Sequence, residues 1–205
     1  MAGPLAGKRV LDVGTGDGTY AIEAASSGAT VAALDSSHAM LAAAQARARK
    51  RGLSLELQAG TVEGLPFQTA SFDVVFAVTV LCFVRDVESA FRELSRVLVP
   101  GGRLVVGELG RWSVWAAKRR IQSIGRQTLW STVHFWTASE LKQRLIAAGL
   151  HVEAVRGAVY FPPMESVARV MAPLETALAR LGTPGAAFLC AVGRKVSYPA
   201  LSKRR

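Results

Sequence analysis

Hydrophobic and polar positions follow two rhythms along the chain, and these rhythms alternate from one end to the other. Short runs of apolar, often β-branched residues predict the buried strands of a parallel sheet. Stretches with apolar residues three and four positions apart predict helices with one buried face. Strands are predicted at 10–13, 30–35, 53–57, 72–80, 103–108, 152–160 and 186–192. This alternation of strand and helix favours an α/β fold with a doubly wound sheet.

The predicted helices begin at polar caps and end at glycines. These signals are Ser36 or Ser37 before a helix over 40–50 that stops at Gly52, Asp86 before the next helix, and Thr137 and Gly149 around a later one. Thr137 and Glu140 have the spacing of a capping box, which satisfies two free N–H groups at a helix start. Pro100-Gly101-Gly102 predicts a turn just before the strand at 103–108.

The first strand runs directly into a glycine-rich turn, Gly14-Thr15-Gly16-Asp17-Gly18. Glycines remove Cβ atoms where a backbone turns tightly and where a ligand must approach closely. The helix that follows, at about 19–27, points its free N–H groups toward such a ligand. A dinucleotide fingerprint needs its third glycine at position 19, where this chain has Thr19. The pattern is instead D-x-G-x-G-x-G, beginning at Asp12.

This pattern resembles motif I of the class I S-adenosylmethionine-dependent methyltransferases. Residues 60–67, 71–75 and 96–104 are similar to later motifs of the small-molecule, type 11-like group, so the resemblance covers about residues 8–108. It implies S-adenosylmethionine as cofactor and S-adenosylhomocysteine as product. It also implies a Rossmann-like, seven-stranded, mostly parallel sheet with the last strand antiparallel, helices on both faces and helical cap inserts. The whole chain, 1–205, is expected to form a single methyltransferase domain.

The resemblance assigns the contacts to the cofactor. Asp12 is expected to help hold the amino group of the methionine moiety, and Thr79 to lie near the methyl group. Asp35 ends the second strand and can take both ribose hydroxyls, although it can also lead into the next helix as a cap. Thr61, where the family has aspartate, is expected to border the adenine. The full predicted set is Asp12, Gly14, Thr15, Gly16, Gly18, Asp35, Ser36, Met40, Thr61, Val62, Glu63 and Thr79.

Two inserts, at about 111–136 and 161–185, are predicted to cap an acceptor pocket. The first holds all four tryptophans among arginines and lysines. It is interpreted as an aromatic lid, as a membrane-contacting segment, or as a helix packed on the core. The second has apolar residues from Met164 to Leu181 at helical spacing, which is also typical of core packing.

The methyl acceptor is expected to meet aromatic and thiol side chains. The predicted pocket residues are Tyr20, Cys82, Trp112, Trp115, Phe135 and Tyr160. His134 is the predicted catalytic base, needed only for an acceptor that is protonated at the working pH. A histidine among aromatic residues can equally be a packed or exposed side chain.

Composition narrows the class of protein further. Half of the 205 residues are hydrophobic, which excludes a disordered chain. The longest apolar run, 74–84, is too short to cross a bilayer, and no secretory signal precedes the first strand. Cys82 and Cys190, the only cysteines, lack metal-ligand spacing, so no metal site is expected. A cytoplasmic location with reduced thiols is expected.

The net charge of +10 changes the list of partners. Basic clusters occur at 47–51, 118–120 and 203–205, but charge alone indicates only non-specific attraction to polyanions. The sequence therefore favours methylation of a small, apolar or aromatic metabolite over nucleic acid. An RNA methyltransferase using the basic surface remains the alternative, as does a non-catalytic, cofactor-binding or membrane-peripheral partner protein. The chain is expected to be a monomer or a homodimer.

Overall fold

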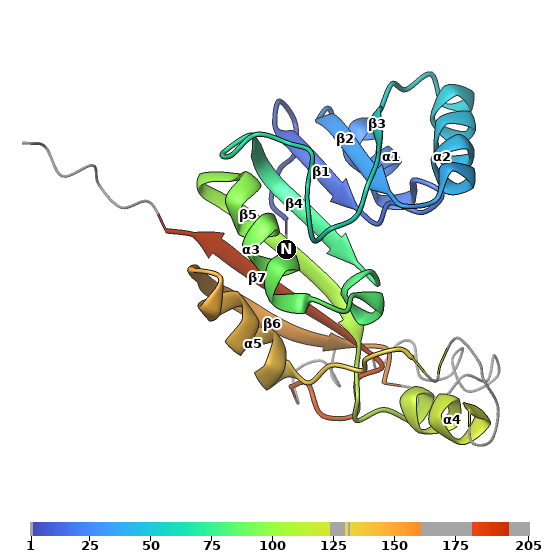
Figure 1. Cartoon of the computed structure of the whole chain (residues 1–205), viewed down its shortest axis with the longest axis vertical. Helices are drawn as coiled ribbons and strands as arrows, with labels where there is room; N and C mark the ends of the chain where they lie inside the picture. Colours follow the sequence, from blue (N-terminus) through green and yellow to red (C-terminus); the bar gives the residue numbers. More distant parts are fainter. Residues whose placement is uncertain (1, 124–129, 131, 161–181, 197–205) are drawn as a thin grey trace, which may run out of the picture.

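One seven-stranded sheet organises the computed structural model, which describes residues 2–123, 130, 132–160 and 182–196 (Figure 1). Its strands are β1 (Arg9–Val13), β2 (Thr30–Asp35), β3 (Glu56–Ala59), β4 (Phe72–Val78), β5 (Leu98–Leu109), β6 (Leu150–Ala158) and β7 (Phe188–Lys195), in the order β3-β2-β1-β4-β5-β7-β6. Strands β1 to β5 pair in parallel, whereas β7 is antiparallel to both β5 and β6. The predicted fold class and the antiparallel last strand are confirmed.

Helices cover both faces of this sheet. They are α1 (Thr19–Ser26), α2 (His38–Lys50), α3 (Val87–Val97), α4 (Val114–Ser123) and α5 (Ala138–Ala147), with a short 3₁₀ helix, η1 (Leu81–Phe83). Val10 of β1 belongs to the core cluster on the α1 face, and its neighbour Leu11 belongs to the cluster on the opposite face, which includes side chains of α3 and α5. Because successive side chains of a strand point to opposite faces, both faces need apolar residues. This explains the nearly continuous apolar runs of the sequence.

The helix caps occur where the sequence predicts them. The Ser37 side chain accepts the Met40 N–H at the start of α2, and Asp86 accepts the Ser89 N–H at the start of α3. Thr137 and Glu140 form the predicted capping box of α5. Gly52 and Gly149 follow their helices with φ of 67° and 75°, the left-handed conformation that glycine adopts without strain.

Most strand boundaries differ from the prediction by a few residues. Strand β4 ends at 78 and not at 80, β6 spans 150–158 and not 152–160, and β7 spans 188–195 and not 186–192. Strand β5 begins at Leu98 and passes through Pro100-Gly101-Gly102, where a turn is predicted, with a register shift opposite Phe72–Val74 of β4. A Cβ at Gly102 would lie 2.9 Å from the Val99 carbonyl oxygen, so glycine lets the backbones pass closely. Strand β3 occupies Glu56–Ala59 and not 53–57.

The inserts are described only in part. The first contains α4, and the predicted helix Met164–Leu181 of the second lies outside the described residues. Among the helices that the structure describes, none has the length and apolar character needed to cross a membrane. Both cysteines are free thiols.

Candidate functional site

The turn after β1 depends on glycine for two different reasons. Gly14 and Gly16 have φ of 67° and 55°, which strains any residue with a side chain. A Cβ at Gly14 would also lie 2.6 Å from Cγ2 of Val80, so this position needs close approach as well. At Gly16 no atom lies within 4 Å of such a Cβ. The turn is therefore packed against the loop after β4 on one side and open above Gly16.

Asp12 supports this turn from within the protein. Its side chain is buried, and Oδ2 accepts hydrogen bonds from Thr15 Oγ1 at 2.6 Å and from the Ala21 N–H at 3.1 Å. Burial raises the pKa of Asp12 to about 6, although these hydrogen bonds oppose the shift. Asp12 thus fastens the turn to the first residues of α1. Its predicted contact with the cofactor remains a prediction.

Asp35 lies at the carboxyl end of β2, beside the turn. Its Oδ2 accepts the Gly16 N–H at 2.8 Å, and its Oδ1 accepts the Ser37 N–H at 2.9 Å. An ionised carboxylate has about four lone-pair sites, so each oxygen retains capacity for another donor. Asp35 can therefore hold the loop and bind two hydroxyls of a ligand at once.

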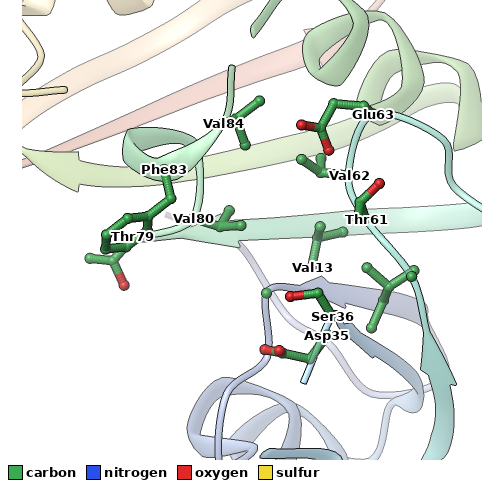
Figure 2. A pocket seen from close by; sticks show the side chains of 13 residues that line it. Val13, Asp35, Ser36, Thr61, Val62, Glu63, Thr79, Val80, Phe83 and Val84 are labelled. Atoms are coloured by element: carbon green, nitrogen blue, oxygen red, sulfur yellow. The ribbon is translucent and has the colours of Figure 1, made fainter. Parts of the chain in front are cut away.

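A cavity of about 400 Å³ opens between this turn and the loops after β2, β3 and β4 (Figure 2). Asp35 and Ser36 lie on one side, Thr61 to Glu63 on another, and Thr79 and Phe83 toward the far end (Figure 2). The predicted cofactor residues that line it are Gly14, Asp35, Ser36, Thr61, Val62, Glu63 and Thr79. The other predicted cofactor residues, Asp12, Thr15, Gly16, Gly18 and Met40, do not line the cavity.

The cavity also has apolar lining residues that the sequence analysis missed. These are Val13, Leu34, Val80, Phe83 and Val84, together with Gly60. Val80, Phe83 and Val84 belong to the apolar run 74–84. The sequence predicts a buried strand over 72–80, which includes the first part of this run. Because β4 ends at Val78, the rest of that run forms a loop and η1 at the cavity wall.

Thr79 marks the change from strand to wall. Its φ is 53°, a left-handed conformation that is rare for a β-branched residue and costs about 1–3 kcal/mol. Its N–H donates to the Gly107 carbonyl at 2.7 Å, and its Oγ1 donates to the Val78 carbonyl at 2.8 Å. These contacts hold the strained residue at the end of the strand.

Glu108 is buried behind the same wall and was missed by the sequence analysis. It ends the apolar core of β5, and its Oε1 accepts the Leu81 N–H at 2.7 Å. Its Oε2 is buried and has no hydrogen-bond partner among the described residues. Burial raises the pKa of Glu108 to about 7, and burial beside this carboxyl group raises the pKa of the Cys82 thiol. An acid at the end of a predicted apolar strand was the available signal.

His134 lies at a second cavity of about 670 Å³, which shares only Val84 with the first. Its Nε2 is 3.4 Å from Arg111 Nη2 and 3.9 Å from Glu140 Oε1, and Arg111 and Glu140 form an ion pair at 2.7 Å. Burial lowers the pKa of His134, although Glu140 opposes the shift. Arginine only donates, so the contact assigns the Nε2 lone pair to Arg111 and the proton of the neutral ring to Nδ1. A base role would require His134 to release Arg111.

The predicted acceptor-pocket residues line neither of these two cavities. Tyr20 is exposed on α1, Cys82 is buried in η1, and Phe135 is buried in the core. Trp112 is exposed before α4 and Trp115 is half-buried on it. Tyr160 donates a hydrogen bond to the Gly182 carbonyl. Their roles toward an acceptor remain predictions.

The sequence of the chain is similar to those of known methyltransferases. Residues 11–106 match the family described as "Methyltransferase domain". The chain is 37% identical over 116 residues to an uncharacterized protein of Mycobacterium bovis, which aligns over 57% of this chain and 40% of that protein. It is 30% identical over 167 residues to the ubiquinone biosynthesis O-methyltransferase of Rhizobium johnstonii, covering 78% of this chain and 67% of the relative. The chain thus spans about two fifths of the mycobacterial relative's length.

A solved structure extends the similarity beyond the matched family segment. It is a protein of Thermotoga maritima described as an S-adenosylmethionine-dependent methyltransferase and possible histamine N-methyltransferase. The two structures align with a TM-score of 0.70 at 26% sequence identity, over 92% of this chain and 82% of that one. The likeness therefore includes the antiparallel end of the sheet as well as the glycine-turn half.

Proposed function

The chain belongs to the class I S-adenosylmethionine-dependent methyltransferases, and we propose that it methylates a small, apolar or aromatic metabolite. The observation that carries the proposal is the cavity where Gly14, Asp35 and the loop at 61–63 converge. When bound, the cofactor supplies a methyl group activated on a sulfonium. The task left to the protein is to bind, to align an acceptor atom and to exclude water.

The lining of the cavity fits this cofactor. Its volume of about 400 Å³ lies within the usual range for small-molecule sites, roughly 300–1,000 Å³. Asp35 has unused lone pairs for ribose hydroxyls, and the glycine turn offers a close approach for the methionine part. Thr61 contributes a hydroxyl and Val62 an apolar surface where an adenine ring would lie.

The acceptor end of the site is apolar. Val80, Phe83 and Val84 contribute the apolar wall around Thr79, and the Phe83 side chain is 50% exposed. Such a wall favours an apolar or aromatic acceptor and limits the entry of water. The relative in ubiquinone biosynthesis supports a small-molecule acceptor in the same sense. A base is required only if the acceptor atom is protonated, and His134 is the candidate for that role.

The basic surface gives weaker support to an RNA substrate. At the end of α2, Arg47 forms an ion pair with Asp17 and donates to Thr19 Oγ1, and Arg51 forms an ion pair with Glu23. These arginines already have partners within the protein, so their charge is partly neutralised. A small-molecule acceptor therefore remains the favoured reading of the site.

The test is calorimetric titration of the full chain with S-adenosylmethionine, S-adenosylhomocysteine and NADH. We expect the two adenosyl ligands to bind and NADH not to bind. Asp35→Ala should weaken both adenosyl ligands by about tenfold to a hundredfold, because hydrogen bonds to a charged group are lost. Asp73→Ala is the matched control, since Asp73 accepts the Arg9 N–H and does not line the cavity.

Two results would contradict the proposal. Tight binding of NADH, or no binding of either adenosyl ligand, would exclude this use of the cavity. If the cofactor binds as expected, an acceptor screen follows, with labelled methyl transfer as the readout. Methylation of RNA with no transfer to any small aromatic acceptor would replace the proposed substrate by the polyanion.

A further inference from the structure

Three large apolar side chains are exposed to solvent on α4 or just before it. Trp112, just before the helix, is 69% exposed, and Val114 and Ile121 on the helix are 58% and 68% exposed. Single exposed apolar residues are ordinary, but a cluster of them marks an interaction surface. Figure 1 shows α4 beyond the end of β5, apart from the sheet.

The orientation of α4 puts these side chains on its outer side. The Ser113 hydroxyl donates to the Gly110 carbonyl at 2.9 Å and accepts the Ala116 N–H at 3.1 Å, which fixes the start of the helix. Ser113 and Ala116 are buried. Val114, Lys118 and Ile121 are spaced by four and three residues, so they share one helix face. We call Trp112, Val114, Lys118 and Ile121 the α4 face.

The charge around this face has a single sign. Lys118, Arg119 and Arg120 lie on α4, and no acidic residue occurs anywhere from 109 to 139. The Arg119 guanidinium lies 4.2 Å from the centre of the Trp130 ring, and that of Arg120 lies 5.3 Å from the Phe135 ring. The cations are therefore interleaved with aromatic and apolar side chains. This combination is typical of helices that lie in the interface of an anionic membrane.

The α4 face is joined to the rim of the cofactor cavity. The chain enters α4 from the end of β5 and returns beside it, where the Arg111 N–H donates to the Trp136 carbonyl at 2.8 Å. On its way back the His134 N–H donates to the Cys82 carbonyl of η1 at 2.9 Å. Phe83, also in η1, lines the cavity. Backbone hydrogen bonds therefore link the segments on either side of α4 to η1 at the cavity rim.

We propose that the α4 face docks the protein on an anionic lipid bilayer. Its three apolar side chains enter the headgroup region, while Lys118 contacts lipid phosphates and the net positive charge attracts the protein to the anionic surface. Where the proposed function also holds, docking brings the cavity rim to an apolar acceptor that partitions into the bilayer. The docking itself does not depend on methyl transfer.

The test is flotation of the full chain with vesicles of neutral phosphatidylcholine, with or without anionic phosphatidylglycerol, at about 0.15 M salt. We expect wild-type protein to float with the anionic vesicles only. Val114→Ser combined with Ile121→Ser should weaken this partition by about tenfold or more, because apolar insertion is lost while every cation is kept. Ile146→Ser is the matched control, since Ile146 of α5 is also exposed, by 64%.

Thermal unfolding and S-adenosylhomocysteine binding of each variant verify that the fold is kept. If the double variant partitions like the wild type, the net charge and not the α4 face drives binding, and the proposal is wrong. Failure of the wild type to float also overturns it, and sedimentation then shows whether a second copy covers the face. Flotation measures membrane binding without methyl transfer. A failure of docking is therefore distinguished from a failure of the proposed function.

Discussion

Single residues at the carboxyl ends of β4 and β5 hold the cavity wall in place at an energetic cost. Thr79 is strained at φ 53°, and Glu108 is buried with one carboxyl oxygen lacking a hydrogen-bond partner among the described residues. The other oxygen binds the Leu81 N–H, in the loop that includes Val80 and Phe83. Glu108 therefore anchors this wall through its hydrogen bond with the Leu81 N–H.

The buried carboxyl group gives a prediction about pH. The pKa of Glu108 is raised to about 7 in the folded protein, from an ordinary value near 4.5. The folded state therefore binds the proton more tightly than the unfolded state. Below about pH 4.5 the carboxyl group is protonated in both states and does not lower the free energy of unfolding, which then falls as the pH rises to about 7. The full cost is on the order of 3 kcal/mol. Glu108→Gln keeps an oxygen for the Leu81 N–H and removes this titration.

We expect the free energy of unfolding of Glu108→Gln, minus that of the wild type, to grow between pH 5 and pH 8. Urea unfolding at several pH values measures this difference. Asp12, with a pKa raised to about 6, is present in both proteins and cancels. A difference that does not change with pH would show that Glu108 is not buried as an ionisable group.

Among single residues, the sequence indicated those whose role follows from a local pattern. Gly14 and Asp35 could be indicated from their places at the ends of predicted strands and Thr61 from the family resemblance, and all three line the cavity. Phe83 could not be indicated in this way, because its place in the wall depends on where β4 ends, and the sequence signals Glu108 only as an acid at the end of a predicted strand, not what packs around it. The side-chain pattern of an apolar run does not say where a strand stops.

At the scale of whole elements, caps were easier to predict than strand boundaries. A cap such as Ser37 or Asp86 depends on residues within one helical turn of it. The start of β5 depends instead on pairing between Leu98 and Phe72, far away in the sequence. Pro100-Gly101-Gly102 is a strong local turn signal, and it persists inside β5 as the register shift between the pairs Phe72–Leu98 and Val74–Arg103, with Gly101 at a φ of 80°.

The capping box of α5 gives a prediction about stability. Thr137 Oγ1 accepts the Glu140 N–H at 3.2 Å, and Glu140 Oε2 accepts the Thr137 N–H at 2.7 Å. Thr137→Ala should lower the free energy of unfolding by about 1 kcal/mol, because a helix N–H loses its partner. Ser139→Ala, at an exposed position of the same helix, should change it much less. Equal effects of the two substitutions in urea unfolding would contradict the role of the cap.

For the whole molecule, the arrangement of the sheet came from the resemblance and not from periodicity. Alternating strands and helices predict a doubly wound sheet, but nothing in the strand pattern alone puts β7 between β5 and β6. The cofactor cavity illustrates the same limit, since its walls come from turns after four different strands. Motifs indicated several of its residues, and only the folded sheet brings them to one edge.

The position of β7 also has a consequence for the order in which the protein can be made. The strands β1 to β5 can pair as they leave the ribosome, but β6 has no neighbour in the sheet except β7. The last described strand must therefore enter between two strands made before it. Lys195 then fixes its end, with Nζ donating to the Ser95 and Leu98 carbonyls at 2.8 Å each.

A ribosome-bound chain stalled before residue 188 should consequently protect β1–β4 from protease while β6 stays open to cleavage. Extending the chain so that residue 195 has left the exit tunnel should then protect β6 as well. Early protection of β6 in the shorter chain would contradict this order. Until β7 arrives, the unpaired edge of β5 is a template on which the same strand of another nascent chain can bind, so synthesis on crowded polysomes exposes this protein to strand exchange.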